Sequence, residues 1–376
     1  MNRQLPLSLC SLALLLGCSA EQPRSVSPAF YHWQTSLQLT ENERLHLDSL
    51  GVKKLYVKFF DVDWDEASGQ AVPLAKVEID TERLAGLEIV PVVFITNRTL
   101  VNLPAGEVDS LAGRIFEKIL ALADSPLTPK GEPNRRDSSV NWQGFRVNEV
   151  QFDCDWTEQT REKYFRLLEA FRQKTASSNS FLIPHPPSLS STIRLHQLKF
   201  FEKTGVPPVD RGMLMFYNTG DLEDWQTENS ILDLNAAINY LPKSKIAYPK
   251  PLDVALPLFR WGVIFRDGEM IKLINDLSES DLQDTTRFEK IAAHRFAVRK
   301  STYLDGYYLY AGDLIRLESV SRERLEQAAE LLANRFPKSS RFRKSSRTVA
   351  FYHLDATLMA SFPAGALTKI LQNWER

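Results

Sequence analysis

Carboxyl and amide side chains alternate with apolar ones along the short stretch "EVQFDCDW" at residues 149–156. Gln151, Asp153 and Asp155 follow one another at a spacing of two, so in a β-strand all three point to the same side. Two carboxyl groups one step apart and shielded from water do not both ionise easily, and we expect the pKa of one to rise. A proton held in this way can serve acid–base chemistry. If Lys58 points the same way, it would instead give the carboxylates a counter-charge in a purely structural polar core.

Polar and aromatic residues also stand at the ends of other apolar stretches. Aromatic rings beside carboxylates and amides suit a sugar, whose C–H faces stack on rings while its hydroxyls take hydrogen bonds. Trp156 is an exception, because it shares the parity of Phe152 and Cys154 and is expected to pack under a helix. Besides Asp153 and Asp155, the candidate site residues are Trp33, Asp61, Asp63, Trp64, Asn97, His185, Tyr217, Asn218, Arg260, Trp261, His353 and Asp355.

The elements that would position these residues are short β-rich stretches, most of them apolar on both faces, as buried parallel strands are. The predicted strands are residues 29–33, 53–64, 89–96, 149–156, 180–185, 212–218, 253–261 and 348–354. Amphipathic helical patterns separate them, and one begins with a capping box formed by Thr40 and Glu43. This alternation predicts an α/β fold, a closed (β/α)8 TIM-type barrel, with the doubly wound open sheet as the alternative. In a barrel the strand-end residues meet at one rim.

Two insertions interrupt this pattern. One precedes the fourth strand and is rich in turn-forming and charged residues, and the other lies between the seventh and eighth strands, between Arg266 and Arg347. The second insertion includes "YLDGYYLYAGDLIRLES", which predicts a small hairpin. The serines after His185 are interpreted as a turn that leads into a helix capped by Ser190 or Ser191. Residues 29–376 are predicted to form a single barrel domain.

The amino-terminal segment is predicted to be a lipoprotein signal peptide, residues 1–17. Arg3 precedes a short apolar run whose end, "LLGC", resembles a bacterial lipobox, which implies cleavage before Cys18 and its modification with palmitate-type acyl chains. A plain secretory signal is the alternative. A tether over residues 18–28 would follow, and the protein would lie in the bacterial envelope, anchored to the outer membrane or facing the periplasm. Of the three cysteines only Cys154 would then remain, so no internal disulfide is expected.

Composition and motifs exclude several classes of function. The chain has 376 residues and a net charge of -1, which gives no reason to expect a nucleic acid partner. Histidines and carboxylates at strand ends could bind a metal, but no HxH, HExxH or paired-cysteine spacing occurs. The sequence also contains no glycine loop for phosphates and no GxSxG elbow. We therefore predict neither a metal nor another cofactor.

Two short motifs carry a family resemblance. "FDCDWT" resembles the fourth-strand signature of the chitinase-type (family 18) glycoside hydrolases, and "MFYN" at residues 215–218 resembles that family's sixth-strand motif. The resemblance implies that Asp155 orients the acetamido group of a substrate and that Tyr217 hydrogen-bonds it. In that family the glutamate that acts as general acid comes two residues after this aspartate, and here Thr157 occupies that position. The adjacent Glu158 has the opposite strand parity, so its side chain is expected to point the other way. A hydroxyl cannot act as the general acid.

A looser resemblance runs along most of the chain. The stretch "QFDCD" followed by "YFRLLEAFR" is similar to an uncharacterised family of bacterial envelope lipoproteins, which implies a barrel and export but no activity. The sequence thus predicts a lipid-anchored envelope protein whose glycoside-hydrolase-like barrel binds glycans, with or without hydrolysis. For hydrolysis Asp153, Asp155 and Tyr217 would be catalytic, and an acid would come from elsewhere: Asp61, Asp63 or Asp355. The alternative is a non-catalytic glycan-binding or scaffold lipoprotein that has lost the general acid.

Overall fold

The computed structural model describes residues 26–74, 76–80, 82–124, 145–178, 180, 182, 186–337 and 347–374. The predicted signal peptide, Cys18, His185 and the first insertion, residues 125–144, lie outside the described residues.

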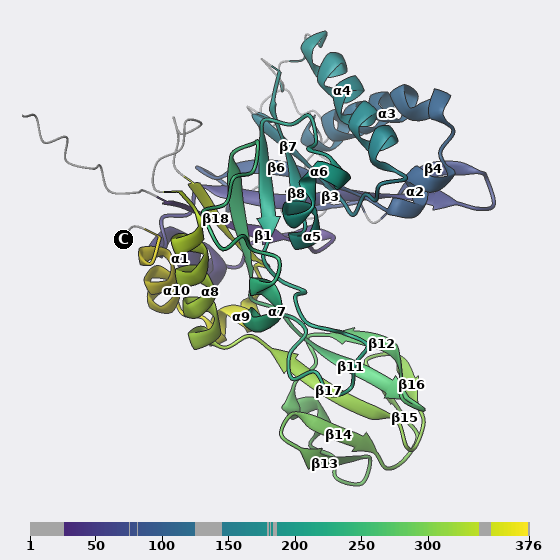
Figure 1. Ribbon diagram of the computed structural model, residues 1–376, viewed down its shortest axis with the longest axis vertical. Coiled ribbons are helices and arrows are strands. Elements are labelled where there is room, and N and C mark those ends of the chain that lie inside the picture. Colours follow the sequence, from purple (N-terminus) through teal and green to yellow (C-terminus); the bar gives the residue numbers. More distant parts are fainter. Residues whose placement is uncertain are drawn as a thin grey trace, which may run out of the picture.

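Within the described part of the chain, eight parallel strands close into a barrel (Figure 1). The strands are β1 (Val26–His32), β3 (Lys54–Asp65), β6 (Glu88–Ile95), β7 (Glu149–Cys154), β8 (Ser188–Ile193), β9 (Arg211–Met215), β10 (Leu252–Pro257) and β18 (Arg347–Tyr352). The barrel closes because β1 pairs with both β3 and β18. The predicted (β/α)8 fold is confirmed, and the open doubly wound sheet is wrong.

Helices follow most of the strands and cover the outside of the barrel (Figure 1). They are α1 (Glu41–Ser49), α2 (Asn97–Asn102), α3 (Val108–Asp124), α4 (Arg161–Ala176), α5 (Leu195–Lys199), α6 (Phe201–Thr204), α7 (Leu234–Ile238), α8 (Arg322–Arg335), α9 (Ala356–Ser361) and α10 (Ala364–Gln372). The predicted capping box is present at α1, where Thr40 and Glu43 each accept from the other's backbone N–H. The connection from β3 to β6 contains β4 (Gln70–Leu74), which pairs with β3, and β5 (Glu78–Ile79), which pairs with β2 (Ser36–Leu37).

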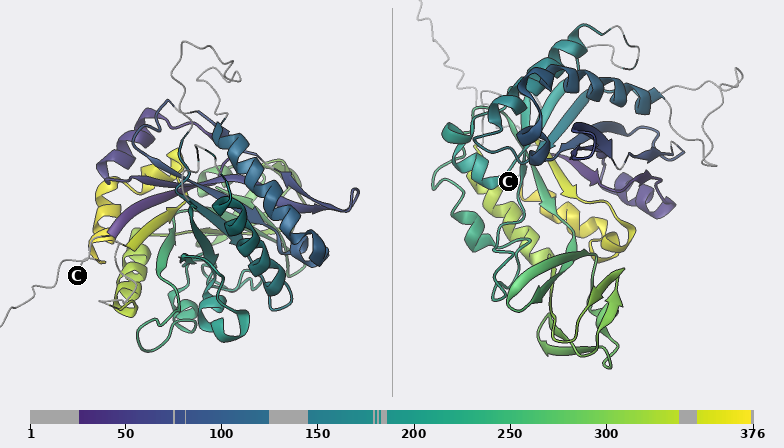
Figure 2. Two further views of the ribbon diagram at one scale, coloured as in Figure 1. Left: turned by 90° about the horizontal axis from the view of Figure 1, so that it is seen from above. Right: turned by 90° about the vertical axis from the view of Figure 1, so that its right-hand side faces the viewer.

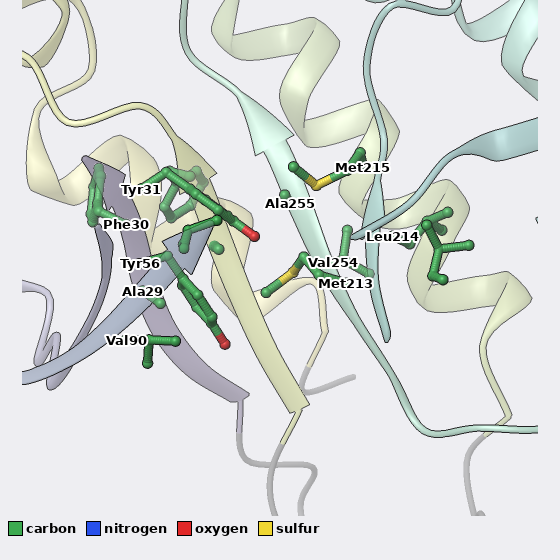
Figure 3. Close-up of a cluster of buried hydrophobic side chains, with 14 of the residues drawn as sticks. Ala29, Phe30, Tyr31, Tyr56, Val90, Met213, Leu214, Met215, Val254 and Ala255 are labelled. Atoms are coloured by element: carbon green, nitrogen blue, oxygen red, sulfur yellow. The ribbon is translucent and has the colours of Figure 1, made fainter. Parts of the chain in front are cut away.

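The inner face of β7 is polar and its outer face is apolar, as its alternating sequence predicts. On the inside, the Tyr31 hydroxyl donates to Gln151 across the barrel at 2.6 Å, and Tyr31 itself stacks on Tyr56 (Figure 3). On the outside, Trp156 stacks on Tyr164 of α4 with 5.1 Å between ring centroids. The prediction that Trp156 packs under a helix is therefore confirmed.

The fifth barrel strand was misplaced by sequence. It is β8, which pairs with β7 and β9, and not residues 180–185. The predicted helix cap at Ser190 or Ser191 is wrong, since both serines are inside this strand.

The polar row of β7 explains why so polar a sequence forms a buried strand. The Ser190 hydroxyl donates to Glu149 and the Thr192 hydroxyl donates to Asp153, each at 2.7 Å. Buried acceptors need donors, and cross-strand neighbours are placed to supply them. The hydroxyl side chains of β8 are therefore the partners that the polar face of β7 requires.

The insertion after the seventh strand forms a separate antiparallel sheet (Figure 2). Its strands are β11 (Arg260–Arg266), β12 (Glu269–Asn275), β13 (Phe288–Ala292), β14 (Arg295–Val298) and β17 (Leu314–Ser319), with the short helix η2 (Glu279–Leu282) and a hairpin of β15 (Thr302–Leu304) and β16 (Tyr307–Leu309). The predicted insertion and hairpin are confirmed. The single predicted strand over 253–261 is wrong, because β10 ends at Pro257 and β11 begins at Arg260.

The inserted sheet has its own apolar core. Ile264, Phe288 and Ile315 are buried together there, apart from the larger cluster inside and around the barrel. Figure 2 shows this sheet projecting from one end of the barrel.

Candidate functional site

A cavity of about 510 Å³ lies where the ends of the barrel strands face the inserted sheet. Nine sequence-predicted candidates line it: Trp33, Asp61, Asp153, Asp155, Tyr217, Asn218, Arg260, Trp261 and His353. Residues that the prediction did not include also line it: Gln34, Lys58, Phe94, Arg194, Phe259, Asn275, Asp276 and Tyr352. The carboxylate row of β7 therefore opens into a cavity and is not sealed under packed side chains.

Arg194, the residue directly after β8, organises the carboxylates. Its guanidinium donates to Asp155 and lies 3.5 Å from Asp153 Oδ1. It also lies near the Tyr217 hydroxyl, and its charge lowers the pKa of that hydroxyl against the larger, raising effect of burial. The expected counter-charge, Lys58, is instead paired with Asp61 at 3.3 Å. One arginine thus pairs with both carboxylates of β7 and lies near Tyr217, the three residues predicted to be catalytic if the protein hydrolyses glycans.

The two carboxylates of β7 differ in exposure. The Asp153 side chain is 5% exposed and that of Asp155 is 54% exposed. Burial, with a smaller contribution from Asp155, raises the pKa of Asp153 against the opposing effect of Arg194. The expected rise in one pKa of the pair is confirmed, and its main cause is loss of water.

A chain of aromatic rings forms one wall of the cavity. Trp33 lies against Tyr352 with 5.5 Å between ring centroids, and Tyr352 lies 5.4 Å from Tyr217 and 5.8 Å from Phe259. Phe259 in turn lies 5.1 Å from Trp261. Rings in contact at these distances stabilise one another, so the wall is fixed before a ligand arrives.

The inserted sheet also supplies polar groups to the cavity. Asp276 follows β12, and its backbone carbonyl accepts from Arg260 Nε at 3.0 Å. Desolvation, followed by the charge of Asp355, raises the pKa of the Asp276 carboxyl. The inserted sheet therefore offers both a guanidinium and a carboxyl that retains its proton more readily than usual.

Four sequence-predicted candidates have structural partners and do not line the cavity. Asp63 accepts from Thr96 at 2.7 Å and is paired with Arg98, while Trp64 continues the β3–β4 ladder. Asn97 begins α2 and accepts from Thr160 at 2.7 Å. Asp355 is the N-cap of α9, where its carboxylate accepts from two backbone N–H groups. Structural hydrogen bonds and an ion pair therefore account for Asp63, Asn97 and Asp355 without a role in the cavity. The remaining candidate, His185, lies outside the described residues.

The position of the family's acid is also away from the cavity. Thr157 donates its backbone N–H to Thr160 at 2.9 Å, and neither Thr157 nor Glu158 is among the lining residues. Both side chains are exposed on the loop after β7. No bulge turns Glu158 inward.

Sequence reasoning missed Arg194 because the fifth strand was misplaced. With the strand at β8, Arg194 becomes a strand-end residue like the other candidates. No sequence pattern marked Asp276 as a site residue. It follows β12 of the insertion, and only the folded structure brings it to the cavity.

No known sequence family and no curated protein matches this chain. Among solved structures, the C-terminal domain of a putative chitinase from Desulfitobacterium hafniense is similar, with a TM-score of 0.50, 11% identity and coverage of 94% of this chain and 100% of that one. This chain therefore shares the (β/α)8 barrel fold of that domain.

Two other structures align less closely. The spore cortex-lytic enzyme SleL of Bacillus megaterium has 12% identity and a TM-score of 0.48, over 94% of this chain and 75% of that one. A mutant family 18 chitinase of Cycas revoluta in complex with (GlcNAc)4 has 12% identity and a TM-score of 0.45, over 93% of this chain and all of that one, 100%.

No helix in the described part of the chain is long and apolar enough to cross a membrane. No group of three or more His, Cys, Asp or Glu side chains in the same residues is arranged to hold a metal ion.

Proposed function

We propose that the cavity binds a glycan and that the protein does so while anchored to an envelope membrane. The observation that carries the proposal is the aromatic wall from Trp33 to Trp261, set beside the Arg194 cluster in one cavity. Sugar C–H faces stack on rings, and charged groups in the same cavity accept and donate hydrogen bonds to hydroxyls.

The geometry favours binding without hydrolysis. Arg194 neutralises Asp155, and the loop residue Thr157 offers only a hydroxyl outside the cavity. The cavity has an aromatic wall, and its two β7 carboxylates are paired with Arg194. No acid is present at Thr157, where the chitinase-type hydrolases have theirs. These features suit a protein that binds a glycan without cleaving it.

Hydrolysis is the second candidate, and one observation favours it. Asp276 lines the same cavity as Asp155, and desolvation raises the pKa of its carboxyl, which makes Asp276 the candidate general acid. In this version the general acid comes from the inserted sheet, and neither Asp63 nor Asp355 is available for the role.

Calorimetry with a panel of soluble oligosaccharides, including tetramers of N-acetylglucosamine, tests the binding proposal. We expect Trp33→Ala to weaken binding about tenfold, since a stacked aromatic ring contributes about 0.5–1.5 kcal/mol beyond its buried area. Phe200→Ala is the matched control, because Phe200 is an exposed aromatic outside the lining residues. Equal affinity of the Trp33 variant and the wild type would exclude this cavity as the site.

The same panel separates binding from hydrolysis. Wild-type protein that binds a sugar but releases no reducing ends over a long incubation acts as a binding protein. Turnover that disappears in Asp276→Asn and persists in Phe200→Ala would establish hydrolysis and overturn the preferred form of the proposal.

Membrane anchorage is tested at Cys18. We expect Cys18→Ser to move the protein from the membrane fraction to the soluble fraction and to abolish labelling by an alkyne analogue of palmitate. Cys10→Ser is the control, because Cys10 would leave with the signal peptide. If Cys18→Ser stays in the membrane fraction, Cys18 is not the anchor.

A further inference from the structure

The hairpin of the inserted sheet carries four exposed aromatic side chains within eight residues. Tyr303, Tyr307, Tyr308 and Tyr310 are 67%, 40%, 45% and 53% exposed. We call these four residues the tyrosine surface. Leu304 and Leu309 of the same hairpin are buried. Tyr303 and Tyr308 lie on the face opposite the buried leucines, while Tyr307, directly across from Leu304, is on the leucine face and is partly exposed there.

The rings of the tyrosine surface have fixed neighbours. Tyr303 and Tyr308 are a cross-strand pair with 5.0 Å between ring centroids, and Tyr308 meets Tyr310 edge to face at 5.1 Å. The Lys272 ammonium lies 4.2 Å from the centroid of Tyr307. Edge-to-face contacts leave separate ring faces available for separate ligand units.

Arg266 anchors one end of this surface. Its guanidinium lies 4.4 Å from the ring of Tyr310 and pairs with both oxygens of the buried Asp313, at 2.7 and 2.8 Å. Asp313 also accepts the backbone N–H of Tyr310 at 2.8 Å. A bidentate pair held in this way loses little freedom on binding, so the ring beside it is preorganised.

The tyrosine surface is connected to the proposed glycan cavity by one strand. β12 presents Lys272 to Tyr307, and its end leads into Asn275 and Asp276 of the cavity wall. Four residues of extended strand span about 13 Å. A ligand that extends beyond the cavity along β12 would reach the hairpin first at Tyr307.

The chemistry of the surface favours a polysaccharide over a lipid bilayer. Residues 260–319 contain nine Lys and Arg against ten Asp and Glu, so this region has no excess positive charge for anionic lipids. The exposed rings of the hairpin all carry hydroxyls, and its own leucines, Leu304 and Leu309, are buried, whereas Ile271 and Ile291 of the neighbouring strands β12 and β13 are exposed. Tyrosine faces flanked by cations match the C–H faces and hydroxyls of sugars.

We propose that the tyrosine surface binds a second stretch of a glycan polymer whose other stretch occupies the cavity. The inference rests on the proposed function and extends it, because it assigns the ligand class as a polymer longer than the cavity and assigns a second binding site to the insertion.

Co-sedimentation with two insoluble probes, chitin and peptidoglycan sacculi, tests this proposal. We expect the double variant Tyr303→Ala, Tyr308→Ala to bind at least one of these polymers about tenfold more weakly, with its affinity for a soluble tetrasaccharide unchanged. Tyr303→Phe with Tyr308→Phe is the matched control, because it retains both rings. An unchanged thermal unfolding midpoint confirms that each variant is folded.

The outcomes distinguish this inference from the function of the cavity. Loss of tetrasaccharide binding in Trp33→Ala, with normal polymer binding in the tyrosine variant, supports the cavity and overturns the tyrosine surface. Tyrosine-dependent polymer binding without any tetrasaccharide binding overturns the cavity proposal and leaves the surface supported. A wild type that binds neither polymer, or that binds anionic vesicles or a protein through these tyrosines instead, overturns the inference.

Discussion

Replacing Arg194 with alanine should lower the free energy of unfolding by about 3–5 kcal/mol at neutral pH, the usual cost of removing one partner from a buried ion pair. Asp153 is nearly buried, and Arg194 is its cationic partner in the cavity. Without the guanidinium, Asp153 keeps only the hydrogen bond from Thr192. An uncompensated carboxylate would then remain in a site with little access to water.

The loss should depend on pH in a defined direction. The pKa of Asp153 is already raised in the folded protein by burial, and removal of Arg194 raises it further, because Arg194 opposes that shift. A raised folded pKa makes the fold relatively more stable below the unfolded pKa, near about 3.9, and less stable as pH rises through the folded value. The Arg194 variant should therefore lie closer to wild type at low pH than at neutral pH.

Urea unfolding of the wild type and the Arg194 variant, at neutral pH and at a pH below about 3.9, measures this difference in the free energy of unfolding. Adding Asp153→Asn to the Arg194 variant should recover most of the loss at neutral pH, because the amide oxygen still accepts from Thr192 and carries no charge. Arg166→Ala is the control, since Arg166 and Asp109 are both half exposed and such pairs contribute about 0–1 kcal/mol. A loss that is equal at both pH values would contradict burial of the Asp153 charge as the cause.

The barrel was predictable because its strands are encoded locally. The alternation in β7 separates a polar inner row from an apolar outer row, and the structure confirms both sides of that separation at Gln151 and Trp156. Apolar composition on both faces indicated most other strands in the same way. Periodicity carries this information without any knowledge of tertiary contacts.

The strand β8 was not predictable by the same rule, because its sequence is polar. Its hydroxyl side chains are buried because they donate hydrogen bonds to the carboxylates of β7, and this pairing depends on contacts between two strands distant in sequence. The polar row of β7 was nevertheless a usable signal, because a buried row of acceptors demands a neighbouring strand of donors. That reasoning would have identified residues 188–193 and placed Arg194 at the rim.

The sequence did not indicate which residues the inserted sheet would bring to the cavity. Arg260 and Trp261 were predicted as ends of a barrel strand, but they begin β11 of the insertion and reach the cavity from there. Asp276 reaches the same cavity through a hairpin. The docking of one sheet against the rim of the barrel decides which of these side chains meet, and no local pattern encodes that docking.

The docking itself depends on a buried ion pair, and its removal should produce the second large effect. Glu318 and Arg316 are 0% and 1% exposed and lie 2.6 Å apart. Glu318 also accepts from the backbone N–H of Ser230 at 2.7 Å and from Trp261 Nε1 at 2.9 Å. This carboxylate therefore joins the inserted sheet to the loop after β9 and fixes a ring of the cavity wall.

We expect Glu318→Ala to lower the free energy of unfolding by about 3–5 kcal/mol, because it leaves the Arg316 charge buried without its counter-ion. Replacing both residues with apolar ones, Arg316→Met with Glu318→Leu, should cost much less than the single change, since no unpaired charge remains. Glu326→Ala is the control, because Glu326 pairs with the exposed Lys369 and should contribute about 0–1 kcal/mol.

A second measurement links this network to the cavity. In the double apolar variant the fold is retained, but Trp261 has lost the acceptor for its indole N–H. Its ring is then free to turn, and oligosaccharide affinity should fall although no lining residue has been replaced. Unchanged affinity in that variant would show that packing against Phe259 alone fixes Trp261. Affinity that falls with stability restored would establish Glu318 as a positioning residue for the aromatic wall.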